Sequence, residues 1–115
     1  MKGSQGDSFR LRHIIEAIES IDRFLVGVSA TDFRNNYMLP LAVVKLFENI
    51  GEASNRLTPD LRHRFPEVDW VLIIRSRNIL MHEYFQIDID IVWETIQHDL
   101  PKLKAQIQKI FTEHE

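Results

Sequence analysis

Residues 77–84 of this 115-residue chain read Arg77-Asn78-Ile79-Leu80-Met81-His82-Glu83-Tyr84. This stretch places a fixed cation, an amide, an imidazole and a phenol inside an otherwise apolar helical pattern. A helix turns about 100° per residue, so Arg77 and Tyr84 share one face while Asn78 and His82 share the adjacent flank. Because arginine keeps its charge in a protein, Arg77 is costly among apolar neighbours unless it is paired. We therefore expect Arg77 either to form a structural ion pair or to bind a charged ligand.

The helix that carries this stretch is apolar on more than one side. It is predicted to begin at Asp69, or at the turn around Glu67. Helical spacing places Trp70 and Ile73 on one face and Leu72 on the opposite face. Such a helix is either fully buried, or it packs on a core with one side and on a partner with the other.

Apolar stripes elsewhere in the chain predict three further long helices. Each stripe repeats every three or four residues, which is the spacing of one helix face. The stripes run over residues 11–25, 42–57 and 89–110. Pro101 interrupts the last stripe and is expected to kink that helix near Gln97, because the proline ring displaces the Gln97 carbonyl.

Capping residues mark the expected helix starts, and two of them predict short extra segments. The candidates are Asp7 or Ser8, Ser29 with Asp32 three residues on, Thr58 before Pro59, and Asp88 or Asp90. No stretch reads convincingly as a strand, so we expect an all-α fold, an up-and-down four-helix bundle with one or two extra short helices. Residues 1–6 are rich in glycine and serine and are expected to be disordered, which leaves residues 7–115 as one helical domain.

The composition excludes several classes of site and protein. There is no cysteine, so disulfides, thiol nucleophiles and cysteine–zinc sites are excluded. The five histidines form no metal-binding pattern and there is no glycine-rich phosphate loop, so we expect neither a metal nor a cofactor. No apolar run reaches the roughly 20 residues that span a membrane. Nothing in the sequence resembles a signal peptide, so we expect a cytoplasmic protein without membrane contact.

The charge is unevenly distributed along the chain. The net charge of −3 argues against a surface that coats nucleic acid generally. Five arginines nevertheless gather in its middle, namely Arg56, Arg62, Arg64, Arg75 and Arg77. A local basic site on an acidic body is therefore possible.

Arg77, Asn78 and His82 together suit metal-independent RNA cleavage. Histidine titrates near neutral pH and can act as a general acid or base. Arginine holds a phosphate with a fork of donors, and asparagine can position a phosphate oxygen or a hydroxyl. In RNA the 2′-hydroxyl can attack its own phosphate, so the protein need not supply a nucleophile.

A structural role for the same residues is favoured by the chemistry alone, because structural ion pairs also create such groupings. Arg77 can be a buried cation paired with Glu48 or Glu52. His82 can be satisfied near a helix end, and Tyr84 can be a packing residue whose hydroxyl reaches solvent. Arg77 and His82 also diverge by roughly 140° on one ideal helix, so one helix alone aims them poorly at one phosphate. A twofold homodimer would solve this, because two such helices can form a composite cleft.

At these residues the sequence resembles a known family. Arg-x4-His-x-Tyr, here Arg77 to Tyr84, resembles the signature of HEPN-domain toxins of the HepT type, which are encoded beside a minimal nucleotidyltransferase, MntA. The similarity runs over nearly the whole chain. Matching pieces lie at residues 12–18, at Ile50-Gly51-Glu52-Ala53, at residues 66–70 and at residues 84–88.

The resemblance implies a HEPN-like helical bundle that forms a homodimer, and the activity of an endoribonuclease that needs no metal. It implies that Arg77 and His82 are catalytic, with Asn78 and Glu52 as supporting residues. It also implies that an MntA-like antitoxin inactivates the toxin by transferring AMP from ATP to Tyr84. Added phosphate charge and bulk at Tyr84 would block RNA and compete for the arginine.

Two other functions remain open in the sequence. The first is a non-catalytic helical binding module that docks on a partner nucleotidyltransferase and regulates it, which would fit the acidic net charge and the doubly apolar central helix. The second is a purely structural dimer. Loss of RNA cleavage in a His82→Ala variant separates the nuclease from both.

Overall fold

The computed structural model describes residues 2–74 and 88–114 and shows a helical protein. The described elements are α1 (Lys2–Phe24), α2 (Ala30–Asn35), α3 (Leu39–Asn55), α4 (Pro59–Arg64), α6 (Ile89–Glu94), the π-helical turn η1 (Thr95–Asp99) and α7 (Leu100–His114). Residues 70–74 are helical as well, and no strand occurs in the described parts of the chain. This confirms the predicted all-α class.

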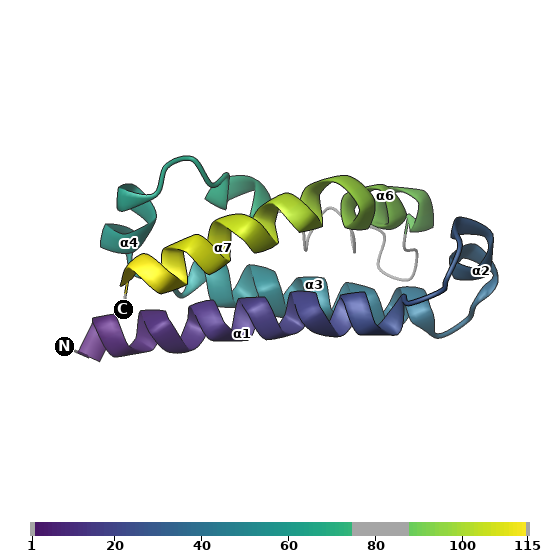
Figure 1. Ribbon diagram of the computed structural model, residues 1–115, viewed down its shortest axis with the longest axis horizontal. Helices are drawn as coiled ribbons and strands as arrows, with labels where there is room; N and C mark the ends of the chain where they lie inside the picture. The colour runs from purple at the N-terminus through teal and green to yellow at the C-terminus, as the bar shows by residue number, and fades with distance from the viewer. Residues whose placement is uncertain (1, 75–87, 115) are drawn as a thin grey trace.

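Helix α1 is the element on which the bundle is built. It packs along both α3 and α7, and Figure 1 shows the three running side by side. The predicted stripe of α1 faces inward, since Leu11, Ile14 and Ile21 are fully buried. Burying one such side chain contributes about 1.5–3 kcal/mol, so the stripe dictates how α1 must pack. The stripes of α3 and α7 meet it through Val43 and Ile107, which are also fully buried.

The start of α1 lies ahead of both candidate caps. The helix begins at Lys2. Asp7, one of the two candidate caps, lies inside the helix and is almost fully buried. Its carboxylate accepts hydrogen bonds from the Thr58 backbone N–H (2.9 Å) and the Thr58 Oγ1 (2.6 Å). This contact holds the first turns of α1 against a distant part of the chain.

The connection from α1 to α2 follows the predicted turn chemistry. Gly27 has a φ of 74°, a left-handed backbone conformation that only glycine adopts without strain, and α1 has ended three residues earlier. Ser29 then caps α2 with the expected capping box, since its side chain accepts from the Asp32 N–H while Asp32 accepts from the Ser29 N–H. Phe33 of α2 is fully buried and packs its ring 5.2 Å from that of Trp93.

The expected irregularity before Pro101 is present as the π-helical turn η1. Proline has no backbone N–H and its ring clashes with the carbonyl four residues earlier, which belongs to Gln97. The chain accommodates this with a wider turn over Thr95–Asp99, in which the Leu100 N–H donates to the Thr95 carbonyl. Helices α6, η1 and α7 therefore follow one another without a connecting loop.

The remaining helix starts agree with the sequence. Thr58 caps α4 ahead of Pro59, and Pro40 lies in the first turn of α3. Among the described helices, none has the length and apolar composition needed to cross a membrane.

Candidate functional site

The predicted site divides between described and undescribed parts of the chain. Arg77, Asn78, His82 and Tyr84 lie outside the described residues, so no geometry is given for them. Glu52 is described, and so are both segments that lead into residues 75–87. The described evidence on the site therefore comes from the two flanking segments and from Glu52.

The segment before the predicted site is firmly anchored. Asp69 caps the helix that begins at Trp70, as predicted, with its Oδ1 accepting from the Leu72 N–H at 3.0 Å. Trp70 is buried and its Nε1 donates to the Phe65 carbonyl at 3.0 Å. The predicted faces are also observed, because Val71 and Leu72 are 64% and 51% exposed while Trp70 is 7% exposed. The first turn of this helix thus presents apolar side chains to solvent.

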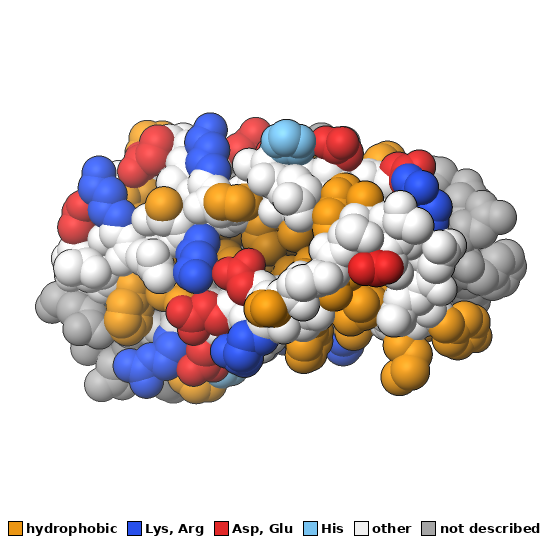
Figure 2. All heavy atoms as spheres, turned by 45° about the vertical axis from the view of Figure 1, so that its right-hand side comes forward, with side chains coloured by type: hydrophobic (Ala, Val, Ile, Leu, Met, Phe, Trp, Pro, Cys, Tyr) orange, Lys and Arg blue, Asp and Glu red, His pale blue; other side chains and the backbone are white. Residues whose placement is uncertain are grey.

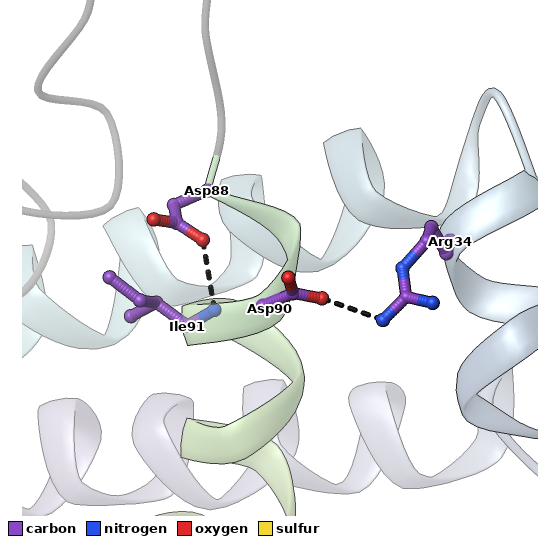
Figure 3. Close-up of polar contacts among 4 residues, drawn as sticks. All are labelled: Arg34, Asp88, Asp90 and Ile91. Carbon is purple, nitrogen blue, oxygen red and sulfur yellow. Dashed lines mark hydrogen bonds and ion pairs between the residues drawn. The ribbon is translucent and has the colours of Figure 1, made fainter.

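The segment after the predicted site is anchored at α6. Asp88 caps α6 by accepting from the Ile91 N–H at 3.1 Å (Figure 3). Asp90 accepts from Arg34 of α2 at 2.8 Å, so α6 is tied to a helix more than fifty residues away in sequence (Figure 3). Both partners of that ion pair are well exposed, so it contributes at most about 1 kcal/mol. The pair helps to hold the start of α6, the first helix after residue 87, beside α2.

Glu52 lies on α3, one turn before the helix ends. Its Oε2 accepts from the Arg56 Nε at 3.0 Å, an i,i+4 pair on the helix surface. Glu52 is half-buried, so its carboxylate is partly shielded from solvent.

Glu52 and Arg56 line an open groove between α1 and α3 of about 560 Å³. Across the groove lie Arg10 and His13 of α1, and Phe9 packs its ring 4.2 Å from that of His13. Cations and acids are mixed here, so the groove does not present charge of a single sign.

A second groove, of about 280 Å³, opens beside the anchored segment before the predicted site. Its walls are mainly apolar and include Phe47, Leu72 and Leu103, while Asp69 and Asp99 also line it. Figure 2 shows one face of the molecule, on which apolar side chains lie exposed between acidic and basic ones. The described surface therefore carries apolar patches beside mixed charges.

Metal ligands do not gather in the described structure. Across residues 2–74 and 88–114, no three histidine, aspartate or glutamate side chains lie close enough together to hold a metal ion.

Two contacts between distant helices were not predicted from the sequence. The first is the buried Asp7–Thr58 contact between α1 and α4. The second is the end-to-end meeting of α4 and α7, where Arg64 lies 3.2 Å from His114 Nδ1. The sequence signals for these residues were caps and charges, which do not indicate which helices become neighbours.

Comparison with known proteins identifies the family. Residues 14–110 match the family model described as "Ribonuclease HepT-like". The chain is 36% identical over 110 residues to "Probable ribonuclease HepT" of Thermococcus cleftensis, covering 96% of this chain and 98% of the relative. It is 37% identical over 98 residues to "Putative RNase MJ1380" of Methanocaldococcus jannaschii, covering 85% of this chain and 90% of the relative.

A third relative gives the same result. "Putative RNase TTE0752" of Caldanaerobacter subterraneus is 36% identical over 100 residues, covering 87% of this chain and 89% of the relative. No solved structure matches the chain significantly. The family match extends over most of the chain, and it confirms both the resemblance seen in the sequence and the expected class of enzyme, a ribonuclease. The chain therefore belongs to the HepT-like ribonuclease family.

Proposed function

We propose that this chain is the toxin of a HEPN/MNT toxin–antitoxin pair and cleaves RNA internally without a metal ion. The observation that carries the proposal is that the family match, residues 14–110, spans the whole of Arg77–Tyr84. These residues hold the arginine and histidine that the cleavage chemistry needs.

The proposed roles follow from the side-chain chemistry. His82 acts as the general base or acid at the RNA 2′-hydroxyl or the leaving oxygen. Arg77 stabilises the charge that develops on the phosphate, and Asn78 positions a phosphate oxygen. Glu52 supports Arg77 as an ion-pair partner, and its half-buried carboxylate on α3 suits that role.

The proposed active form is a homodimer. Arg77 and His82 diverge by roughly 140° on one helix, so two copies of that helix form a better phosphate site than one. The exposed apolar side chains of Val71 and Leu72 support this, because they lie in the described helical segment that leads into the predicted site. Burial of such side chains against a second copy would stabilise the pair.

The proposed control is modification of Tyr84 by an MntA-like nucleotidyltransferase. The Tyr84 oxygen attacks the α-phosphate of ATP, a phosphodiester to AMP forms, and pyrophosphate leaves. The added negative charge repels RNA and competes for Arg77. Incubation with the partner and ATP should add one or more AMP masses to the wild-type chain and none to a Tyr84→Phe variant.

The catalytic proposal is tested by cleavage of single-stranded RNA with EDTA present throughout. The wild type should cleave, and a His82→Ala variant should lose cleavage. His98→Ala is the matched control, since His98 is an exposed histidine of η1 that pairs only with Glu94 among the described residues. Equal rates for the wild type and His82→Ala would refute the catalytic role of His82.

The alternative function is that of a non-catalytic module that docks on the nucleotidyltransferase. It is favoured by the apolar groove with Asp69 and Asp99 among its lining residues, which would suit a protein partner. A stable complex on gel filtration, combined with RNA left intact by the wild type, would establish this function instead.

A further inference from the structure

Helices α1 and α4 each place cations beside α7 at one end of the bundle. Figure 1 shows α4 at the end of the molecule where the two chain termini lie. Asp7 of α1 bonds to Thr58 at the start of α4, and Arg64 at the end of α4 meets His114 of α7. We define the basic cluster as Arg62, His63 and Arg64 of α4 together with Arg12 of α1.

Arg12 belongs to this cluster because it reaches from α1 to α7. Its guanidinium lies 5.7 Å from the centre of the Phe111 ring. Phe111 and His114 are three residues apart and therefore neighbours on the surface of α7. Arg12 and Arg64 thus contact adjacent positions of the same helix.

The cluster is positively charged and its cations are not neutralised by carboxylates within the described residues. Arg12, Arg62 and Arg64 form no ion pair there. The Nε of Arg62 is buried, and it has no hydrogen-bond partner among the described residues. Several acids are close to these cations in sequence. Glu16 and Glu67 form no ion pair within the described residues, and the Asp7 carboxylate accepts from Thr58. Asp60 lies in the first turn of α4, where it complements the helix N-terminus, and Glu113 pairs with Lys109.

Helix α4 holds these cations on a firm support. Its cap, Thr58, accepts from the Leu61 N–H and is itself bonded twice to the buried Asp7. Leu61 is almost fully buried, and the residue after the helix, Phe65, accepts from the indole of Trp70. A ligand that binds the cluster therefore need not order this helix, which lowers the entropic cost of binding.

We propose that the basic cluster binds the phosphodiester backbone of the RNA substrate, outside the residues that cleave it. The proposal rests on the ribonuclease function, which supplies the polyanion. Arginine is suited to phosphate because its planar fork donates two hydrogen bonds at once. The chain carries a net charge of −3, so a local cluster of this kind is needed to attract RNA. Contacts to the backbone position RNA and carry no sequence information.

The test is the salt dependence of RNA binding, measured by fluorescence anisotropy with a labelled, unstructured single-stranded RNA. All proteins carry His82→Ala so that the RNA stays intact. Each phosphate contact contributes about 0.7 to the slope of log affinity against log salt, so Arg62→Gln/Arg64→Gln should lower the slope by about 1.4. At low salt the affinity should fall by roughly five- to tenfold, equally for different sequences.

Two controls separate charge from fold. Arg62→Lys/Arg64→Lys keeps both charges and should keep most of the salt slope. Arg23→Gln/Lys45→Gln removes the same charge from exposed positions elsewhere, and Arg23 lies roughly 24 Å along α1 from Asp7. That pair should bind RNA like the parent. Melting temperatures of all variants establish that each is folded.

The proposal fails if Arg62→Gln/Arg64→Gln has the slope and affinity of the parent, or no larger a change than Arg23→Gln/Lys45→Gln. It also fails if the double variant binds RNA normally but loses its complex with the nucleotidyltransferase, because the cluster is then a protein contact. These outcomes are independent of the catalytic test, since binding is measured without cleavage and His82→Ala is judged only by cleavage.

Discussion

The buried contact between Asp7 and Thr58 is expected to be a major source of stability, and Asp7→Ala tests it. Asp7 is 3% exposed and accepts two hydrogen bonds, at 2.9 Å and 2.6 Å, across 51 residues of sequence. A hydrogen bond to a charged group contributes about 1.5–3 kcal/mol. Alanine removes both acceptors and leaves the Thr58 N–H without its partner, so we expect a loss of about 3 kcal/mol in the free energy of unfolding.

The assay is urea unfolding followed by circular dichroism, together with thermal melts. For a chain of this size about 1 kcal/mol corresponds to roughly 4 °C, so the melting temperature should fall by about 12 °C. Asp7→Asn keeps one acceptor oxygen and should lose roughly half as much. Asp60→Ala, at an exposed acid of α4, is the control and should change stability by less than about 1 kcal/mol.

A double-mutant cycle isolates the interaction itself. Thr58→Ala loses the helix cap and the Oγ1 hydrogen bond to Asp7 but keeps the backbone N–H that also donates to Asp7, so its own cost includes about 1 kcal/mol from the cap. In the Asp7→Ala/Thr58→Ala protein the loss should be smaller than the sum of the single losses by about 1–3 kcal/mol. Additive single losses, or a change below about 0.5 kcal/mol in Asp7→Ala, would refute the reasoning.

Three further predictions concern the fold, and one concerns the site. Ser29→Ala removes the cap of α2 and should cost about 1 kcal/mol in urea unfolding. Phe33→Ala empties a fully buried position and should cost about 3–5 kcal/mol, measured in the same way. Arg34→Ala breaks the exposed pair with Asp90 and should cost less than about 1 kcal/mol, so a larger loss would contradict the weak role assigned to that pair. Glu52→Gln should slow RNA cleavage, because it removes the carboxylate charge proposed to support Arg77; cleavage at the wild-type rate would remove Glu52 from the supporting residues.

Much of the fold was predictable because its signals are local. The stripe through Leu11 and Ile21, the capping box at Ser29 and the irregular turn before Pro101 each depend on residues within a few positions of one another. Apolar periodicity and helix caps involve only residues close in sequence, so both can be recognised in the sequence itself. The exposure of Leu72 opposite the buried Trp70 followed from the same helical phase.

The contacts between distant segments were not predictable in this way. Asp7 has the sequence signature of a helix cap, yet its buried carboxylate accepts two hydrogen bonds from Thr58. Arg34 and Asp90 are 56 residues apart, and neither carries a local sign of the other. Such partners depend on which helix faces pack together, and that choice minimises exposed apolar area over the whole chain.

The sequence by itself determined the helical class, the positions of the caps and the family, because each rests on short-range spacing or on the order of motif residues. Only the tertiary structure decided that the arginines of α4 form no ion pair within the described residues and that Arg64 and Arg12 both contact the last turns of α7. Charge is a property of single residues, but whether it is neutralised depends on neighbours that folding brings from elsewhere in the chain. For that reason the sequence could suggest a local basic site, but only the folded structure could locate it at α4 and Arg12.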